Sequence, residues 1–210
     1  MSPFQRRLTR LGLKVLSRRG FALAGGYALQ EHGFGDRWSD DVDLFTPFHG
    51  GPADAAPVLV QAYEAHSLAV AVEIIGDSFA RLRVREPDGG STKIELCSDW
   101  RTEPPVIVEG LGAVLGVADA VAGKMSALSE RHLPRDFIDI DAVLRSGRLS
   151  RQDLLRLAWE RDPGFDRDAF AEALAAVRFH PDAAYTHYDL DLDEIGVLRV
   201  RFAAWRSELL

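Results

Sequence analysis

The chain has 210 residues, 47% of them hydrophobic and 27% charged, a composition typical of a globular protein with a sizeable buried core. No apolar run is long enough to span a membrane and the N-terminus lacks the apolar core of a signal peptide, so we expect a cytoplasmic protein without a membrane partner. The single cysteine, Cys97, excludes an intrachain disulfide and a cysteine-based zinc site, and predicts a buried, inert thiol. The six histidines lack the spacing of a zinc site, so a metal should have oxygen ligands.

The net charge of -7 argues against a general affinity for nucleic acid, yet residues 1–20 carry basic side chains and no acidic one. Residues 3–18 are predicted to form an amphipathic helix. Its expected apolar face consists of Phe4, Leu8, Leu11 and Val15. A second stripe, which we call the basic stripe, consists of Arg6, Arg10, Lys14 and Arg18. Such a stripe is either a solvated helix face or a surface that contacts phosphates.

A glycine turn follows the first predicted strand. Residues 21–24 form a short apolar run that ends at Gly25 and Gly26, after which residues 27–32 have a helical pattern. Glycines at the N-terminus of a helix let backbone N–H groups approach a polyphosphate closely. A tight turn without a ligand is the alternative.

Two carboxylates stand in the next predicted strand. Asp41 and Asp43 alternate with Val42 and Leu44, and residues i and i+2 of a strand share a face. The two like charges repel each other unless a cation lies between them, and Mg²⁺ combines protein carboxylates with substrate phosphates. The pair by itself is also common at strand ends, but its position after the glycine turn favours a site for a metal and a triphosphate.

The remaining pattern divides the chain into two halves. A helix is expected over residues 53–66 and strands over 69–75, 79–84 and 92–96, with the turn Pro87-Asp88-Gly89-Gly90 joining the last two into a hairpin. Five helices are then expected near 117–131, 135–145, 150–160, 167–176 and 191–208. We therefore predict an α+β fold, with an α/β core over residues 1–110 and a helical domain over 111–210 that completes the active site.

The segment from residue 21 to residue 45 resembles the nucleotidyltransferase superfamily, and within it the AbiEii/AbiGii toxin-like branch. The matching positions are Gly25, Gly26, Ala28, Leu29, Arg37, Ser39, Asp41, Val42, Asp43 and Leu44. Tyr27 departs from the pattern, because many superfamily members have Ser or Thr beside the glycine. The resemblance implies a polymerase-beta-like fold with a mixed sheet, metal ligation by Asp41 and Asp43, and nucleotide binding by Gly25, Gly26 and Ser39.

The resemblance also implies a third carboxylate from a later strand, and Glu95 stands at that place. Ile94 and Leu96 are expected to face the core, which leaves Glu95 and Lys93 together on the opposite face. We include Glu95 as a candidate metal ligand. A surface glutamate paired with a neighbouring cation is the alternative.

A second resembling segment lies in the helical half, over residues 117–144. Its motif residues are Lys124, Ala127, Leu128, Arg131, Arg135, Asp136, Asp139 and Ile140. Lys124 and Arg131 lie on one helix face, so both cations can point at an anionic ligand. We expect Lys124 and Arg131 to bind the triphosphate, and the resemblance implies that Asp136 acts at the active site, where it would orient Lys124 or Arg131. The alternative is that Asp136 is an ordinary carboxylate in the first turn of a helix. Asp139 is expected to cap or pack.

The function predicted from these features is transfer of NMP from an NTP to an acceptor hydroxyl, with Mg²⁺ or Mn²⁺ as cofactor. The branch implies a toxin of a toxin–antitoxin or abortive-infection system, with a tRNA 3′ end as acceptor and a cognate antitoxin as partner. Two alternatives stay open: transfer to a small molecule, as in aminoglycoside nucleotidyltransferases, and a non-catalytic binding module on the same fold.

Overall fold

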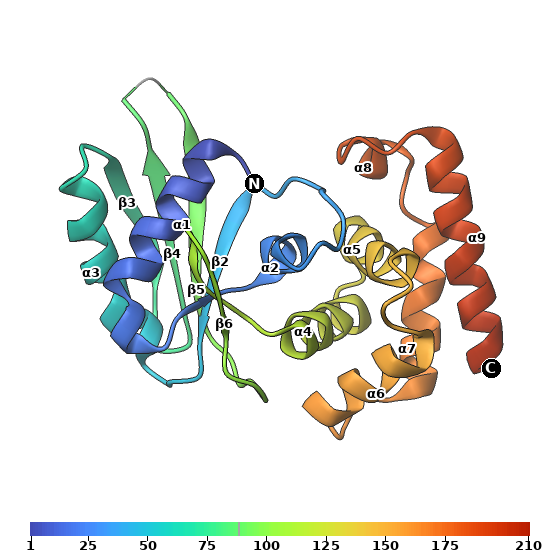
Figure 1. Cartoon of the computed structure of the whole chain (residues 1–210). Helices are drawn as coiled ribbons and strands as arrows, with labels where there is room; N and C mark the ends of the chain where they lie inside the picture. The colour runs from blue at the N-terminus through green and yellow to red at the C-terminus, as the bar shows by residue number, and fades with distance from the viewer. Residues whose placement is uncertain (88) are drawn as a thin grey trace. The chain divides into compact units, whose positions relative to one another are not determined.

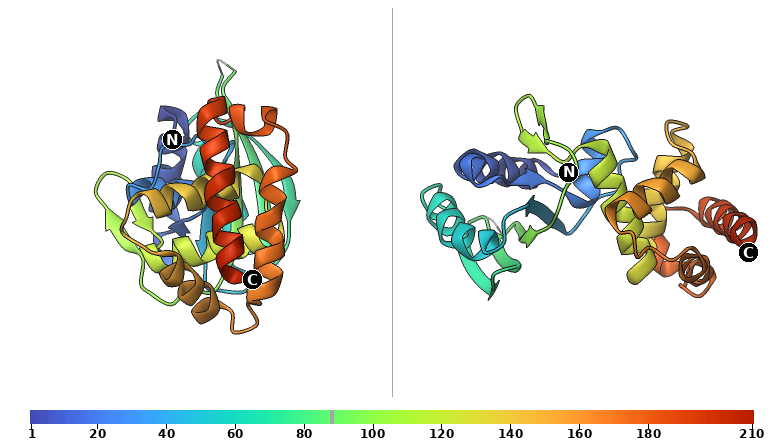
Figure 2. Two further views of the ribbon diagram at one scale, coloured as in Figure 1. Left: turned by 90° about the vertical axis from the view of Figure 1, so that its right-hand side faces the viewer. Right: turned by 90° about the horizontal axis from the view of Figure 1, so that it is seen from below.

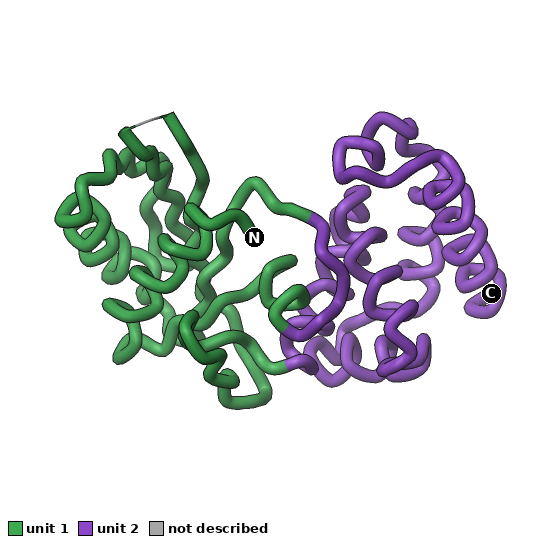
Figure 3. The backbone as a smooth tube through the Cα atoms, turned by 45° about the horizontal axis from the view of Figure 1, so that its top comes forward, with its two compact units in different colours: residues 1–31, 38–116 green, residues 32–37, 117–210 purple. Residues whose placement is uncertain are grey.

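The computed structural model describes residues 1–87 and 89–210, and these fall into two compact units (Figure 3). The first unit contains residues 1–31 and 38–116 and carries the sheet. The second contains residues 32–37 and 117–210 and carries the C-terminal helices. This division makes the fold α+β, as the sequence predicts. The prediction that the chain consists of two domains with a boundary near residue 110 stays a prediction.

The first unit is built on a mixed seven-stranded sheet in the order β3-β4-β5-β2-β1-β7-β6 (Figure 1). Its strands are β1 (Ala22–Leu23), β2 (Asp41–Thr46), β3 (Ala69–Ile75), β4 (Phe79–Arg85), β5 (Ser91–Ser98), β6 (Val106–Val108) and β7 (Gly112–Val114). The β2–β5 and β1–β7 pairs are parallel and the other four pairs are antiparallel. The mixed sheet is confirmed.

The predicted hairpin is confirmed by the antiparallel pairing of β4 with β5, in which Arg85 lies opposite Ser91. Asp88, at the predicted turn, lies outside the described residues. Strands β6 and β7 were not expected from the sequence. Each has three residues, which is too short for an alternating pattern to be recognised.

Two helices cover one face of the sheet. They are α1 (Pro3–Val15) and α3 (Gly51–Glu64), which lie side by side (Figure 2), while α2 (Gly25–Glu31) follows β1. The covered face consists of fully buried side chains that include Val42, Leu44, Ile94 and Leu96. Alternation then places Asp41, Asp43 and Glu95 on the other face, as predicted.

The buried face of α1 differs from the prediction. Buried positions are Gln5, Leu8, Thr9, Gly12 and Leu13, whereas Val15 is 40% exposed. The reason is tertiary. Gly12 lies so close to α3 that a Cβ there would be 2.8 Å from the Tyr63 hydroxyl oxygen, and Gln5 is buried because its amide is hydrogen-bonded. The buried stripe therefore mixes polar, small and apolar residues.

The second unit is a helical bundle. Its helices are α4 (Val117–Glu130), α5 (Pro134–Arg145), α6 (Arg151–Arg161), α7 (Arg167–Ala175), α8 (Ala183–Thr186) and α9 (Leu192–Leu209). The five predicted helices are confirmed, and the four-residue α8 was missed. Helix α9 packs along α7 (Figure 2), and edge-on contacts among Phe137, Phe170, Phe202 and Trp205 fill the core between them and α5. Among the described residues, no helix has the length and apolar character needed to cross a bilayer.

The sheet core makes a stability prediction with a matched control. Ile94→Ala should lower the free energy of unfolding by about 2–5 kcal/mol, because Ile94 is fully buried between the sheet and its helices. Ile75→Ala removes the same atoms from a side chain that is 58% exposed, so it should have a much smaller effect. Denaturant unfolding measures both; equal losses would contradict this assignment of the core.

Candidate active site

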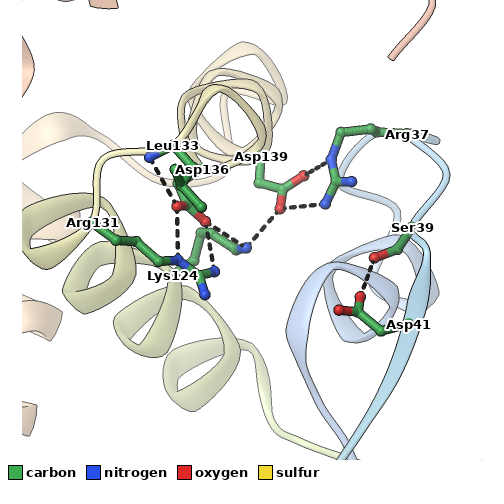
Figure 4. Close-up of polar contacts among 8 residues, drawn as sticks. All are labelled: Arg37, Ser39, Asp41, Lys124, Arg131, Leu133, Asp136 and Asp139. Carbon is green, nitrogen blue, oxygen red and sulfur yellow. Dashed lines mark hydrogen bonds and ion pairs between the residues drawn. The ribbon is translucent and has the colours of Figure 1, made fainter. Parts of the chain in front are cut away.

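The site begins with the two carboxylates of β2. Asp41 and Asp43 are both partly exposed, and they alternate with the fully buried Val42 and Leu44. Ser39 Oγ donates a hydrogen bond of 2.7 Å to Asp41 Oδ1 (Figure 4). Ser39 therefore orients one of the two carboxylates, while the alternation of the strand sets both on one face.

The glycine turn lies against the second carboxylate. Gly25 has a positive φ of 60°, and a Cβ placed on it would lie 1.9 Å from Asp43 Oδ2. No side chain fits there, because real Cβ atoms do not approach an oxygen so closely. Ala24 N–H also donates to Asp43 O at 2.8 Å, which ties the turn to the strand. The structure thus brings together two features that the sequence predicts separately.

A buried polar network supports Ser39 from the other side. The Tyr27 hydroxyl accepts a hydrogen bond of 3.0 Å from Ser39 N–H, and it lies 2.6 Å from Gln5 Oε1. Gln5 Nε2 donates to Ser39 O at 2.7 Å. Tyr27 and Gln5, neither of which the sequence marked as functional, therefore hold the chain that enters β2. Tyr27, which departs from the superfamily pattern, thus accepts a hydrogen bond from Ser39, the residue two positions before Asp41.

Glu95 lies beside Asp43, since the two residues are opposite each other in the parallel β2–β5 pair. The Glu95 carboxylate forms an ion pair with Arg81, whose Nη2 and Nε lie 2.7 and 2.8 Å from Glu95 Oε1. In residues 1–87 and 89–210 no group of three His, Cys, Asp or Glu side chains is close enough to form a ready-made metal site. Glu95 as a metal ligand stays a prediction.

Cys97 lies on the same face of the sheet, opposite Phe45 on β2. It is partly exposed rather than buried as predicted, because it belongs to the polar face of β5. Partial burial and the nearby carboxylates of Asp43 and Glu95 raise the pKa of the Cys97 thiol well above its ordinary value. The thiol is therefore protonated at neutral pH.

The helical unit holds a second polar group, the ion cluster, made of Arg37, Lys124, Arg131, Asp136 and Asp139 (Figure 4). Lys124 Nζ lies 3.1 Å from Asp136 Oδ1 and 2.8 Å from Asp139 Oδ2, so one amine joins both carboxylates. All three side chains are at least nine-tenths buried. Lys124 is consequently not a solvated helix lysine.

An arginine on each side completes the ion cluster. Arg131 Nε and Nη2 donate to the two oxygens of Asp136, each at 3.0 Å, and the Leu133 N–H donates to the same carboxylate at 3.3 Å. Arg37 holds Asp139 in the same bidentate way at 2.8 and 2.9 Å. Three cations then surround two anions, and Arg131 remains 45% exposed.

Burial and charge act in opposite directions on these groups. Burial by itself would raise the pKa values of Asp136 and Asp139, but Lys124 and the arginines outweigh it, and both pKa values end below the ordinary one. Burial would likewise lower the pKa of Lys124, yet Asp139 and Asp136 raise it above its usual range. All members of the ion cluster are therefore charged at neutral pH.

The structure brings together Lys124, Arg131 and Asp136, which the sequence analysis singled out. It also adds two residues to this cluster that the sequence analysis did not assign to the site. Arg37 was part of the matched motif and Asp139 was expected to cap or pack, but their bidentate contact joins positions 102 residues apart. No local pattern encodes such a contact. The only available signal was the presence of both residues in the resembling motifs.

The sheet, its glycine turn and the carboxylate pair define a protein with the nucleotidyltransferase fold. Solved structures agree: the M. tuberculosis MenT4 nucleotidyltransferase toxin Rv2826c matches with a TM-score of 0.63 and 19% identity, covering 98% of this chain and 86% of that one. JHP933 from Helicobacter pylori matches with a TM-score of 0.54 and 19% identity, covering 100% and 94%. At such identities the likeness concerns the fold.

The family is shown by sequence. Residues 7–206 match the family described as "Nucleotidyl transferase AbiEii toxin, Type IV TA system". The chain therefore belongs to this family of nucleotidyltransferase toxins. No curated protein matches the sequence.

The ion cluster predicts a dependence of stability on pH. Asp136 and Asp139 have folded-state pKa values below the ordinary value of about 3.9, so their stabilisation is complete above that pH and is lost as the pH falls through the folded values. Asp139→Asn should cost roughly 3–5 kcal/mol at pH 7, because it leaves Lys124 and Arg37 with one carboxylate fewer. It should also flatten the loss of stability below about pH 4.

Denaturant unfolding across a pH series measures both effects. Glu160→Gln is the matched control, since it neutralises one acid of an exposed pair with Arg156 and should change little. If Asp139→Asn matched this control at pH 7, the ion cluster would not stabilise the fold.

Proposed function

We propose that the protein transfers NMP from an NTP to an acceptor hydroxyl, with Mg²⁺ or Mn²⁺ held by Asp41 and Asp43 and by Glu95 as a third carboxylate. The acceptor hydroxyl gives up its proton to solvent as its oxygen forms a bond to the α-phosphorus, the bond from the α-phosphorus to the bridging oxygen of the β-phosphate breaks, and pyrophosphate leaves. The observation that carries this proposal is the contact of the Gly25 backbone with the Asp43 carboxylate, because it places the glycine turn directly beside one of the two acidic side chains.

The side chains on this face fit a hard divalent ion. Asp41 and Asp43 offer carboxylate oxygens, the ligands that Mg²⁺ prefers, and the Asp43 carboxylate occupies the space that a Cβ on residue 25 would take. A bound divalent ion supplies charge neutralisation for the triphosphate and the leaving pyrophosphate. Ser39 fixes the direction of the Asp41 carboxylate, and Tyr27 and Gln5 fix Ser39. The glycine turn binds phosphate oxygens through backbone N–H groups.

The roles of Lys124, Arg131 and Asp136 toward the triphosphate belong to the same proposal. Support for these roles comes from the hydrogen bonds that Lys124 and Arg131 donate to Asp136, because these bonds fix the direction of both cations. The ion cluster carries one positive charge more than its negative charges, and Arg131 is the cation that is substantially exposed. Lys124 is bonded to two carboxylates here, so a triphosphate has to compete with them for its amine.

A tRNA 3′ end is the acceptor that we propose, with a cognate antitoxin as protein partner and a cytoplasmic location. Family membership and the printed name of MenT4 as a nucleotidyltransferase toxin support a toxin role. The part of the basic stripe that lies on α1 supports a polyanionic acceptor, since Arg10 and Lys14 are both solvent-exposed, whereas Arg18 lies beyond the end of this helix. A small-molecule acceptor is the alternative that the tests below separate.

The first test concerns the carboxylate pair. Asp41→Ala and Asp43→Ala should each abolish nucleotide transfer, with a loss of at least about 10³-fold, because each removes an oxygen ligand from the same ion. Stability should be unchanged or slightly raised without metal, since one of two like charges is removed. Transfer of labelled NMP to total tRNA, with each NTP in turn, measures the effect, and thermal unfolding verifies the fold.

Asp54→Ala is a suitable control for this test. Asp54 is an exposed acid in the first turn of α3, and its removal should leave transfer unchanged. Retained transfer in the Asp41 or Asp43 variant would eliminate the proposed mechanism.

The second test concerns the basic stripe. Replacement of Arg6, Arg10 and Lys14 by Gln should weaken RNA binding and lower the salt slope of log K by about one unit per phosphate contact that is lost. Binding of NTP should not change. Arg6 is already paired with Glu31 at 2.7 Å, so we expect Arg10 and Lys14 to contribute more.

The matched control replaces Arg145, Arg156 and Arg178 by Gln, which makes the same change in net charge on exposed helices of the second unit. RNA binding measured over a salt series distinguishes the two triple variants. If both triple variants had the same salt slope of log K, the basic stripe would be a solvated helix face only. This result would favour the small-molecule acceptor.

A further inference from the structure

Three chain segments meet at the end of β2, and none of them belongs to the carboxylate site. They are residues 17–20, 46–48 and 98–101. Thr46 Oγ1 donates to Arg19 O at 2.9 Å, Asp99 N–H donates to Thr46 O at 2.8 Å, and Ser98 Oγ donates to Phe48 O at 2.8 Å. We call this region the strand-end surface. It lies in the first unit, where α1 and β2 end (Figure 1).

The strand-end surface exposes two large aromatic side chains. Phe48 is 57% exposed and Trp100 is 58% exposed. The Phe48 ring lies on the backbone of Gly20, since a Cβ on that glycine would be 2.7 Å from Phe48 Cε2. Gly20 has a φ of 69°, a conformation that favours glycine. The ring is thus supported on one side and exposed on the other, as a stacking platform for a planar ligand should be.

Within these three segments three arginines face one acidic residue, although the chain has a net charge of -7, and exposed Asp77 adjoins them because its carbonyl oxygen accepts a hydrogen bond from Ser98 Oγ. Arg18 and Arg19 are exposed, and within the part of the chain that the structure describes neither forms an ion pair. Arg101 approaches the same glycine, with its Nη2 3.5 Å from the position of a Cβ on Gly20. The acid within these three segments is Asp99. Exposed guanidinium groups beside exposed rings match the phosphates and bases of a nucleotide chain.

We propose that the strand-end surface binds an unstacked segment of single-stranded RNA, with bases on Phe48 and Trp100 and phosphates at Arg18 and Arg19. This inference rests on the proposed RNA acceptor and specifies how the protein holds it outside the reacting atoms. Thr46 is three residues from Asp43 on the same strand, a span of about 10 Å. An RNA chain held at this surface is therefore within reach of the carboxylates.

The test uses a short labelled single-stranded oligoribonucleotide, its duplex, and the full-length protein. Phe48→Ala and Trp100→Ala should each weaken binding of the single strand by about tenfold, because each removes one stacking partner. Arg18→Gln should instead lower the salt slope of log K by about one unit. The duplex should bind more weakly than the single strand, since its bases are not free to stack on side chains.

Two controls distinguish a specific surface from any exposed ring. Trp159→Ala removes a tryptophan that is 57% exposed on α6, and it should leave RNA binding unchanged. Trp100→Phe keeps an aromatic face and should restore most of the binding that Trp100→Ala loses. A loss in Trp159→Ala equal to that in Trp100→Ala would overturn the proposal.

The outcomes also separate this proposal from the proposed function. If Phe48→Ala and Trp100→Ala bind the oligoribonucleotide like wild type, the strand-end surface is not an RNA site, even when wild type still transfers NMP to tRNA. If both variants lose RNA binding while wild type modifies no RNA, the surface is confirmed and the tRNA acceptor is wrong. If the variants keep RNA binding but no longer bind a purified cognate antitoxin, the surface is a protein-docking site and the proposal is overturned.

Discussion

The contact between the Gly25 backbone and the Asp43 carboxylate is the constraint on which the sheet site depends. A carboxylate so close to main chain requires a residue without Cβ and with a positive φ, which only glycine satisfies at low cost. The turn must therefore follow a strand that pairs with β2, and β1 does so in antiparallel register. This one contact between Gly25 and Asp43 therefore fixes the positions of β1, α2 and β2 relative to one another.

The chain that enters β2 is fixed by buried polar groups rather than by apolar packing. Tyr27 and Gln5 satisfy the backbone of Ser39 from two different helices, and Ser39 in turn directs Asp41. Buried hydrogen bonds of this kind contribute little net stability, but a missing partner is costly, so a fully satisfied network selects one conformation. The polar residues on the buried side of α1 are explained by this requirement.

The ion cluster of the helical unit follows the same logic with full charges. Asp136 and Asp139 lose contact with water on burial. For each carboxylate, an ion pair with Lys124 and a bidentate arginine replaces that water. Such clusters are weak contributors to stability compared with apolar packing, yet they are intolerant of the loss of one member. Arg37 extends the cluster to the segment of residues 32–37, which precedes the strand of Asp41 by a few positions in the chain. Residues 32–37 are thereby anchored to the helices of the second unit, to which they belong.

The sequence by itself determined the features that depend on neighbours along the chain. The period of two at Asp41 and Asp43 set both carboxylates on one face, and the helical patterns after residue 117 located five helices correctly. Tertiary structure decided the rest. The buried face of α1, the support of Ser39 by Tyr27, and the Arg37–Asp139 pair depend on which distant segments meet, and local periodicity carries no information about such meetings.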